Sequence, residues 1–283
     1  MKNYVFGDTG GHKSALFSSL VKLGIDIKNG MIPEGTRIIH VGDLIHKGPG
    51  SSDILKTVDL LIRNNPGQWV QILGNHEFQH IKGSPVFWKC SCTSVDISII
   101  NRWFESGLAH ASFGIDKITS IELEVSAKPK IEVPNKGILF AHGGLTKTWW
   151  DILGNVKSPS ELSAILNGLD ARTITSPGQM LGYINPKVGP VWAIGNDEVF
   201  TSWPATSDMP FMQVHGHTVS YQWSRSKWFR SDPAFKPFRD NTKLNPMSRA
   251  VVTKVANSLL IGVDPGFSTY ADLKEQPYLS FVS

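Results

Sequence analysis

The chain has 283 residues, of which 41% are hydrophobic and 18% are charged. This composition is typical of a folded globular protein and excludes a disordered or fibrous chain. The net charge of +4 suits an anionic substrate as well as a solvated basic surface, so it excludes neither. The sequence contains no signal-peptide core and no apolar run of membrane-spanning length, which predicts a cytoplasmic protein that does not contact a membrane.

Three similar units open the chain, each an apolar strand that runs into a polar, glycine-containing turn. The first lies in residues 4–20, where strand, turn and helical pattern follow one another. The second strand, residues 37–45, precedes a helical pattern that ends at Pro66-Gly67, and the third strand lies in residues 68–77. Such units predict a largely parallel sheet with right-handed crossovers. In such sheets ligands gather beyond the carboxyl ends of the strands.

The remainder of the chain is less regular. Residues 96–107 predict a helix, and alternating apolar positions in residues 118–125 predict a half-buried strand. Ser158 begins a helix, because Pro159 follows it and Glu161 stands three positions later as in a capping box. Further strands are expected in residues 137–145 and 210–218, and a hairpin in residues 250–266.

No repeat, low-complexity tract or flexible linker interrupts the sequence. We therefore expect a single domain over residues 1–283, with irregular excursions at about 78–136 and 145–209.

Polar residues stand at the end of five predicted strands. A single Asp or His in such a place is more often a turn-former or a satisfied polar residue. Several polar strand ends that converge indicate a binding site instead, because the fold places their side chains together. Carboxylate, amide and imidazole groups are ligands of Mn, Fe, Zn or Mg ions. The strand-end residues are Asp8, Asp43, Asn75, His76, His142, His215 and His217.

The cysteines and the remaining histidines give no comparable signal. Cys90 and Cys92 are too close in sequence for an easy disulfide and too few for a zinc site made of cysteine, so we expect reduced thiols with no special role. His40, His80 and His110 are expected to be structural.

The order of the polar motifs resembles the calcineurin-like metallophosphoesterase family. That family reads Asp-x-His, Gly-Asp, Gly-Asn-His-Glu or Gly-Asn-His-Asp, His, and Gly-His along the chain. The stretch VDPG, residues 263–266, is also similar to the sheet-closing strand of the related Ser/Thr phosphatases. The matching motifs here are GDTGG (7–11), GDLIHKGP (42–49), GNHE (74–77), AHGG (141–144) and HGHT (215–218).

The resemblance implies an α/β fold, a four-layer αββα sandwich of two mixed β-sheets flanked by helices, with the site at the strand carboxyl ends. It also implies two divalent metal ions, Mn, Fe, Zn or Mg with Mn favoured, and a hydroxide bound by both ions that attacks phosphate mono- or diesters. His76 would be the general acid that protonates the leaving oxygen. The implied metal ligands are Asp8 for the first ion, Asp43 as the bridging carboxylate, and Asn75, His142 and His217 for the second ion.

The first metal position departs from the family pattern. Gly10 stands where the family has a His, and Val219 stands where the family has its last His ligand. His12, two residues after Gly10, is the favoured replacement ligand, because the glycine turn is flexible enough to bring its ring to the ion. The alternative is that the first ion is weakly held and His12 is only near it.

The substrate-binding candidates are Lys47, His46 and His215. The phosphatases nearest to this pattern have Asp and Arg where this chain has His46 and Lys47. Lys47 attracts phosphate as a point charge, without the two-pronged grip of Arg. His46 would orient His76 or touch the substrate. Strand alternation places His215 on the same face as His217, so it would support a ligand or meet the substrate.

Residues 221–239 interleave basic and aromatic side chains. This pattern allows nucleic-acid binding, but we favour a loop whose aromatic rings pack on the core while its charges face water. The predicted partner is therefore a phosphorylated substrate of open class, with the oligomeric state also open.

Two other functions compete with hydrolysis. A non-catalytic scaffold could keep this fold and bind a partner, and Gly10 is the feature in its favour. A nucleotide switch is disfavoured, because the glycine turn lacks the Lys and the spacing of a P-loop. The substrate stays open among phosphoproteins, dinucleoside polyphosphates, nucleotides and nucleic-acid diesters.

Overall fold

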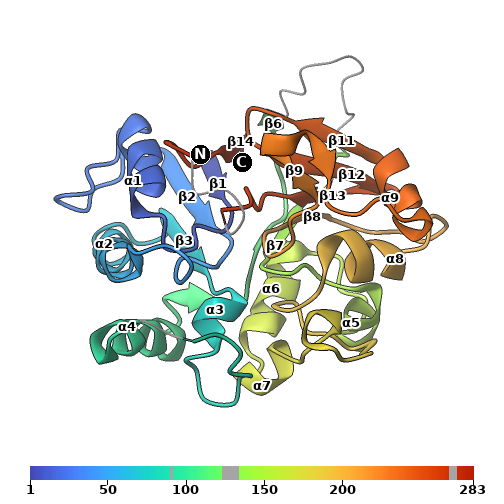
Figure 1. The fold of residues 1–283 in the computed structure, drawn as a ribbon, viewed down its shortest axis with the longest axis horizontal. Coiled ribbons are helices and arrows are strands. Elements are labelled where there is room, and N and C mark those ends of the chain that lie inside the picture. Colours follow the sequence, from blue (N-terminus) through green and yellow to red (C-terminus); the bar gives the residue numbers. More distant parts are fainter. Residues whose placement is uncertain (90–91, 123–133, 268–272) are drawn as a thin grey trace.

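Two β-sheets lie face to face, and helices cover the outer face of each (Figure 1). This computed structural model describes residues 1–89, 92–122, 134–267 and 273–283. Helices α1, α2 and α4 lie on one side of the sheets, and α5, α8 and α9 lie on the other (Figure 1). The predicted four-layer α/β sandwich is confirmed.

The first sheet has six strands in the order β4-β3-β2-β1-β14-β6. Strands β1 to β4 run parallel, as the three opening units predict, and β14 pairs antiparallel with both β1 and β6. Only Ser120–Glu122 of the strand predicted at residues 118–125 is a strand among the described residues, and residues 123–125 lie outside them. The strands are β1 (Lys2–Phe6), β2 (Thr36–His40), β3 (Trp69–Ile72), β4 (Ala109–His110), β6 (Ser120–Glu122) and β14 (Tyr278–Val282).

The second sheet also has six strands, in the order β11-β12-β13-β8-β7-β5. Its central strands β7, β8 and β13 are parallel, and the hairpin of β12 and β13 is the one expected in residues 250–266. A separate pair, β9 (Tyr221–Gln222) and β10 (Lys227–Trp228), lies outside both sheets. The strands are β5 (Ser112–Ile115), β7 (Ile138–Ala141), β8 (Met212–His215), β11 (Thr242–Asn245), β12 (Ala250–Val255) and β13 (Ser258–Gly262).

The helices begin and end close to their sequence signals. In α2 the apolar positions Ile54, Leu55 and Val58 are buried, as their spacing predicts. Ser158 caps α6 by accepting a hydrogen bond from the backbone N–H of Glu161. The α-helices are α1 (Lys13–Lys22), α2 (Ser51–Asn64), α3 (Asn75–Phe78), α4 (Ser94–Glu105), α5 (Lys147–Ile152), α6 (Pro159–Asn167), α7 (Ala171–Ile174), α8 (Phe200–Ser202) and α9 (Lys236–Asp240). Shorter turns are η1 (Gln179–Leu181), η3 (Trp223–Arg225) and η4 (Pro233–Phe235), with a π-helix at η2 (Gly195–Val199). Among the described residues, no helix combines the length and the apolarity that a membrane span requires.

The aromatic segment at residues 221–239 is not the loop that was expected, because it contains β9, η3, β10, η4 and most of α9, but most of its rings pack as predicted. Phe235 and Phe238 are buried, and the ring of Trp228 contacts both. Arg230 forms ion pairs with Asp197 and Asp232. Tyr221, Trp223 and Trp228 pack against this small cluster, whereas Phe229 is exposed.

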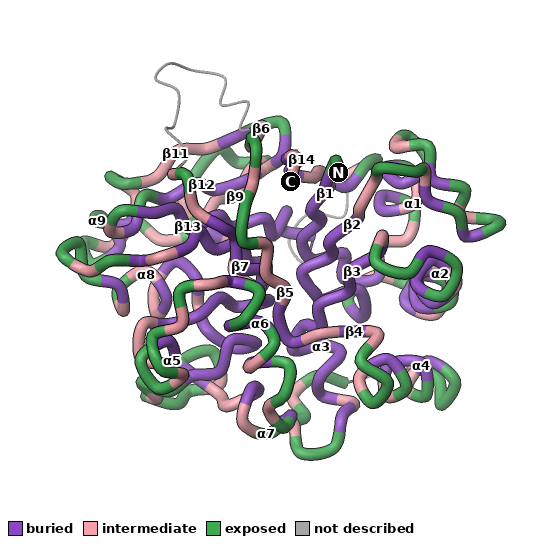
Figure 2. The backbone as a smooth tube through the Cα atoms, turned by 180° about the vertical axis from the view of Figure 1, so that it is seen from behind, coloured by how far each residue is buried: buried purple, intermediate pink, exposed green. Residues whose placement is uncertain are grey.

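An apolar layer between the sheets holds them together. It is contributed by inward side chains of both sheets, such as Val5 and Phe281 from the first and Phe140 and Ile261 from the second. The rings of Phe140 and Phe281 stack with their centroids 5.9 Å apart. Figure 2 shows β3, β7 and β13 buried along their length, whereas the edge strands β5 and β11 are only partly buried. This shared apolar layer therefore fixes the position of one sheet relative to the other.

Phe140→Ala tests this core. Phe140 is fully buried, so truncation should lower the free energy of unfolding by about 3–5 kcal/mol, which urea denaturation measures. Phe229→Ala is the matched control, since that ring is 56% exposed and its loss should change stability by less than about 0.5 kcal/mol. A similar, small effect of both substitutions would contradict the assigned core.

Candidate metal centre

The carboxyl ends of strands from both sheets bring carboxylate and imidazole groups together. Asp8 follows β1, Asp43 follows β2 and His142 follows β7. One ligand atom from each of these residues lies within 4.8 Å of the others, and all three side chains are buried. The first and second sheets therefore contribute jointly to one cluster, as the sequence predicts.

Asn75 and His217 complete the cluster. Asn75 is the first residue of α3, directly beyond β3, and His217 lies just after β8. The Asn75 Oδ1 atom is 2.9 Å from His142 Nε2 and 3.1 Å from His217 Nδ1. Asp43 Oδ1 is 3.2 Å from the same His142 Nε2 atom. Four side chains thus direct N and O atoms at one buried point.

The tautomer of His142 shows what this point is suited to hold. The Nδ1 atom lies 2.8 Å from the carbonyl oxygen of Val41, which only accepts hydrogen bonds, so Nδ1 carries a proton. In the neutral ring, Nε2 then presents a lone pair to the oxygens of Asn75 and Asp43. Lone pairs that face one another in a buried site repel unless a cation lies between them. A metal-binding His commonly donates its other N–H to a carbonyl in this way.

Asp8 is a second indication that the cluster suits a cation. Its Oδ1 atom accepts a hydrogen bond of 2.9 Å from the backbone N–H of His217. Its Oδ2 atom is buried and has no hydrogen-bond partner among the described residues. Burial, Asp264 and Asp43 raise the pKa of Asp8 well above its ordinary value. A divalent cation would satisfy both the unpartnered oxygen and the surplus of carboxylates.

Two glycines allow the loops to approach this closely. A Cβ atom on Gly74 would lie 2.1 Å from Asp43 Oδ1, and one on Gly216 would lie 2.2 Å from Asp8 Oδ1. Asp43 and His217 themselves have φ angles of +56° and +63°, which non-glycine residues rarely adopt. Strain of this kind concentrates at functional sites, where it costs about 1–3 kcal/mol for each residue.

Glu77 fixes the loop that carries Asp43. Its buried carboxylate accepts hydrogen bonds from the backbone N–H groups of Gly74, Asp43 and Leu44, each 2.8 Å long. Burial and the charge of Asp43 raise the pKa of Glu77 to about 8, while the N–H donors oppose this. The GNHE motif contains Glu77, but the sequence analysis assigned it no role.

The Asp8 turn is fixed by a chain of directed hydrogen bonds. The N–H of Gly42 donates to His40 Nδ1, so the proton of the neutral ring is on Nε2, 2.8 Å from Thr9 Oγ1. Thr9 donates in turn to Gln276 Oε1, and Gln276 Nε2 donates to the carbonyl of Gly7, both at 2.8 Å. Burial lowers the pKa of His40 to about 3, which keeps the ring neutral. His40 is thus structural, as expected.

His76 and His46 form a hydrogen-bonded pair beside the cluster. Their Nδ1 atoms are 2.6 Å apart, and His76 Nε2 lies 3.7 Å from Asp43 Oδ2. The rings of Phe87 and Trp88 contact His76 with centroids 5.0 and 5.2 Å away. Burial lowers the pKa of His76 to about 4 and that of His46 to about 3. The predicted contact between His46 and His76 is therefore present in the structure.

Lys47 supplies a positive charge at the same place. Its Nζ atom is 3.9 Å from Asp43 Oδ2. Burial alone would lower the pKa of Lys47, but Asp43, Asp8 and Asp264 outweigh it and raise the pKa. Burial alone would raise the pKa of Asp43, yet His142, His76 and Lys47 hold it below its usual range. Lys47 is thus a permanent cation at the edge of the cluster.

A comparison with known protein families agrees with this geometry. The family model described as calcineurin-like phosphoesterase matches residues 1–245. The chain belongs to this family. The membership predicted from the motifs is confirmed, and the matched range includes each of the predicted site residues.

Individual members of the calcineurin-like phosphoesterase family are distant relatives. The chain is 26% identical over 152 residues to an asymmetrical bis(5'-nucleosyl)-tetraphosphatase, PrpE, of Oceanobacillus iheyensis, a match that covers 51% of this chain and 57% of the relative. Two solved structures are similar in fold. A cold-active protein tyrosine phosphatase has a TM-score of 0.52 at 18% identity, over 99% of this chain and 73% of that one. A cold-active protein-tyrosine phosphatase of a Shewanella species has a TM-score of 0.50 at 16% identity, over 98% and 74%.

Asp264 is a further acidic neighbour that the sequence analysis did not assign. It follows β13 within the VDPG stretch, and its Oδ1 atom accepts a hydrogen bond from the N–H of Gly266. It is buried, and burial raises its pKa. This charge also raises the pKa of Asp8, so Asp8, Asp43 and Asp264 form a group of three interacting carboxylates. The likeness of VDPG to a phosphatase strand was the available signal.

The structure gives His12 a packing contact and no place in the cluster. Its ring stacks on Phe267, with centroids 4.8 Å apart and planes 12° from parallel. It precedes α1, and it is not part of the cluster of Asp8, Asp43 and His142. The ligand role favoured from the sequence stays a prediction, and this geometry supports the alternative that was left open.

His12→Ala separates the two alternatives. Since the ring is held against Phe267, we expect the substitution to leave the number of bound metal ions and their affinity unchanged, as measured by calorimetry and elemental analysis. Asp8→Asn is the matched comparison, and it should weaken the first ion by at least about tenfold. A comparable loss of affinity in both variants would instead establish His12 as a ligand.

His215 lies at the last position of β8, so strand alternation does not extend to His217. Its buried ring packs against Gly195, where a Cβ atom would lie 2.1 Å from His215 Cε1. Its Nδ1 atom is 2.8 Å from the carbonyl of Gly216. These contacts give His215 a packing role, and its role toward substrate stays a prediction.

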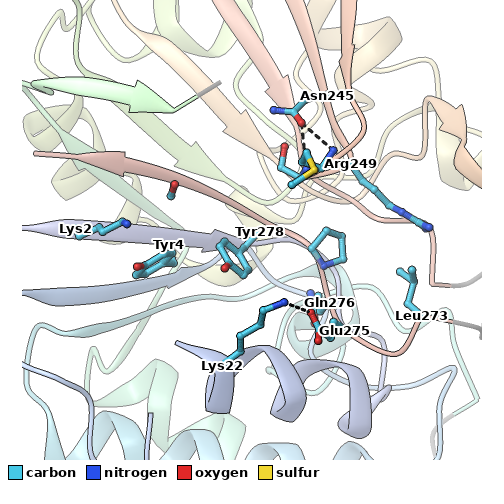
Figure 3. A pocket seen from close by; sticks show the side chains of 13 residues that line it. Lys2, Tyr4, Lys22, Asn245, Arg249, Leu273, Glu275, Gln276 and Tyr278 are labelled. Carbon is cyan, nitrogen blue, oxygen red and sulfur yellow. Dashed lines mark hydrogen bonds and ion pairs between the residues drawn. The ribbon is translucent and has the colours of Figure 1, made fainter. Parts of the chain in front are cut away.

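A pocket of about 480 Å³ lies elsewhere, against β1, α1 and β14 (Figure 3). Lys22 and Glu275 form an ion pair in it, and Gln276 lines it. None of the proposed metal ligands lines this pocket.

Proposed function

We propose that the protein is a metal-dependent phosphoesterase that hydrolyses phosphate mono- or diesters. The observation that supports this proposal is the convergence of buried N and O atoms of His142, Asn75 and Asp43, an arrangement that a bound cation would stabilise. The unpartnered oxygen of Asp8 supports a second cation. Family membership supports phosphoester hydrolysis as the reaction.

Two groups of side chains would hold the ions. Asp43 is shared by both positions. The first position has Asp8 and Asp43, with Asp264 beside them. Divalent ions bound here would neutralise the phosphoryl oxygens and provide a nucleophile from water at neutral pH. The second position consists of Asp43, Asn75, His142 and His217.

The remaining side chains act on the substrate directly. Lys47 would attract the phosphate, since its ammonium group is held beside the two positions. In its protonated form, His76 would donate a proton to the leaving oxygen from Nε2, the ring atom that faces Asp43, and would be left as the neutral ring. His46 replaces the Asp of related phosphatases, so it would orient His76 without stabilising a positive charge on it.

The nature of the ions and the cellular location extend this proposal. Oxygen and imidazole ligands suit Mn, Fe, Zn or Mg, and we favour Mn because carboxylates dominate the first position. We place the protein in the cytoplasm, as the sequence analysis predicts. A non-catalytic scaffold is less favoured, because its members lose ligands or the acid His, whereas this chain keeps Asp43, Asn75, His142, His217 and His76.

The experiment is a substrate panel. Purified protein supplied with Mn²⁺ should cleave para-nitrophenyl phosphate or its bis-ester, and chelation should abolish the activity. The panel also includes a dinucleoside tetraphosphate, because the relative from Oceanobacillus iheyensis is named as a tetraphosphatase. If none of Mn²⁺, Fe²⁺, Zn²⁺ and Mg²⁺ gives turnover with any of these esters, the scaffold is the better description.

A further inference from the structure

A second cluster of metal-binding side chains lies on the outer side of His46. It is made by His46, from the loop after β2, by His80, just after α3, and by Cys92, just before α4. One ligand atom from each lies within 4.8 Å of the others. None of these atoms belongs to the metal centre described above. The cluster therefore joins three separate loop segments, which flank β2, α3 and α4.

The separations between these atoms match tetrahedral zinc. His46 Nε2 is 3.4 Å from His80 Nε2 and 3.6 Å from Cys92 Sγ. Zinc binds imidazole nitrogen at about 2.0–2.1 Å and thiolate sulfur at about 2.3 Å. At tetrahedral angles these bonds place two nitrogens about 3.3 Å apart and a nitrogen and a sulfur about 3.6 Å apart. Both observed separations therefore agree with the separations expected for two ligand atoms of one zinc ion.

We propose that His46, His80 and Cys92 bind a Zn²⁺ ion in a site separate from the metal centre. Two imidazoles and one thiolate are a ligand set that zinc prefers and that Mg²⁺ or Mn²⁺ does not. His46 is buried, whereas His80 and Cys92 are partly exposed, so the ion enters from the side of these two residues.

Hydrogen bonds fix the segments around the cluster. Gln79 Oε1 accepts hydrogen bonds from the backbone N–H groups of Phe87 and Trp88, which fixes the orientation of its amide. Its Nε2 atom then lies 3.5 Å from His46 Nε2 and from His80 Nε2, so an ion bound by these two nitrogens would displace this amide group. Thr93 and Asp96 form a reciprocal capping box that fixes the start of α4, one residue after Cys92. The two flanking segments are therefore held by their own hydrogen bonds.

Zinc in this site would determine which ring nitrogens carry protons in the neighbouring pair. With Nε2 of His46 on zinc, its remaining proton is on Nδ1, which faces His76 Nδ1 at 2.6 Å. His76 then accepts this hydrogen bond and keeps its own proton on Nε2, toward Asp43. This consequence rests on the proposed function, in which His76 Nε2 is the donor. The ion would make His46 a positioning residue for His76.

Cobalt substitution tests the site without any turnover measurement. Chelator-treated protein is titrated with Co²⁺, and a thiolate ligand gives a sulfur-to-cobalt charge-transfer band in the near ultraviolet that nitrogen and oxygen ligands do not give. We expect this band in the wild type and its loss on addition of Zn²⁺. Cys92→Ser should abolish the band and remove one Zn²⁺ equivalent per chain, and His80→Ala should weaken Zn²⁺ binding at least about tenfold.

Two control variants make the outcome specific. His110→Ala removes a half-buried histidine outside both clusters and should keep the band. Asp43→Asn should lose the metal centre and also keep the band, so failure of the zinc proposal and failure of the proposed function are distinguishable. A wild type without the band under excess Co²⁺ would show that the three side chains form a hydrogen-bonded cluster only. A band that survives in Cys92→Ser would equally overturn the proposal.

Discussion

Asp43→Asn is expected to abolish hydrolysis and to release the metal ions. The carboxylate lies 3.2 Å from His142 and 3.9 Å from Lys47, and it is shared by both proposed metal positions. A divalent ion supplies several kcal/mol of stabilisation to a phosphoryl transition state, and each 1.36 kcal/mol is tenfold in rate. We therefore expect kcat/KM to fall by at least about 10³-fold, with metal content measured on the same samples.

The fold should survive this substitution, because the backbone contacts of residue 43 do not depend on its charge. Its N–H still donates to Glu77, and its carbonyl still accepts from Thr9 and Gly10. Asp59→Asn is the matched control, since Asp59 is a buried carboxylate whose partners Arg63, Arg102 and Trp103 are not part of the cluster. It should keep both metal ions and full turnover. Residual turnover above one tenth in Asp43→Asn, with metal retained, would contradict the assigned centre.

His76→Ala should have the second largest effect, and the effect should depend on the leaving group. General acid catalysis contributes about 10²–10⁴-fold. For an alkyl phosphate, whose leaving oxygen needs a proton, kcat should fall by this factor. For para-nitrophenyl phosphate, whose leaving group departs as a stable anion, the fall should be much smaller. Steady-state kinetics on both esters with His76→Ala and wild type measures the difference.

The leaving-group contrast separates an acid from a structural residue. If His76 only supported the packing of Phe87 and Trp88, both esters would lose activity equally. His110→Ala should lower neither rate, and metal content should stay unchanged in both variants. An equal loss for the two esters would therefore remove His76 from the role of proton donor.

The parts of the site that could be predicted are those that local sequence determines. Asp8, Asp43 and Asn75 each follow a buried strand of the same parallel sheet, so the topology alone brings them to one edge. His142 and His217 follow parallel strands of the other sheet, and the face-to-face packing brings the two edges together. A short apolar run followed by a polar turn is a local pattern, so it can be recognised in a short window of the sequence.

The parts that could not be predicted depend on distant contacts. Strand β14 pairs Val282 with Lys2 and separates β1 from β6, and no local pattern signals this partner. Asp264 has a motif but no sign that its charge faces Asp8. His80 and Cys92 meet His46 only because three loops converge, so no spacing between them marks a metal site. For Cys92 the expectation of no special role rested on the number of cysteines and their spacing, and histidines were not considered as partners.

The hydrogen bonds from Gln276 to the turn at Gly7 and Thr9 have a consequence for biogenesis. Thr9 and Gln276 are separated by 267 positions, and a ribosome needs roughly 15–50 s to travel that far at about 5–20 residues per second. Throughout this interval the nascent turn lacks its hydrogen bonds with Gln276, although Asp8 and Asp43 have already been synthesised. Stable binding of metal ions at Asp8 and Asp43 would therefore be one of the last events of folding, because the turn that carries Asp8 is fixed only after Gln276 has been synthesised.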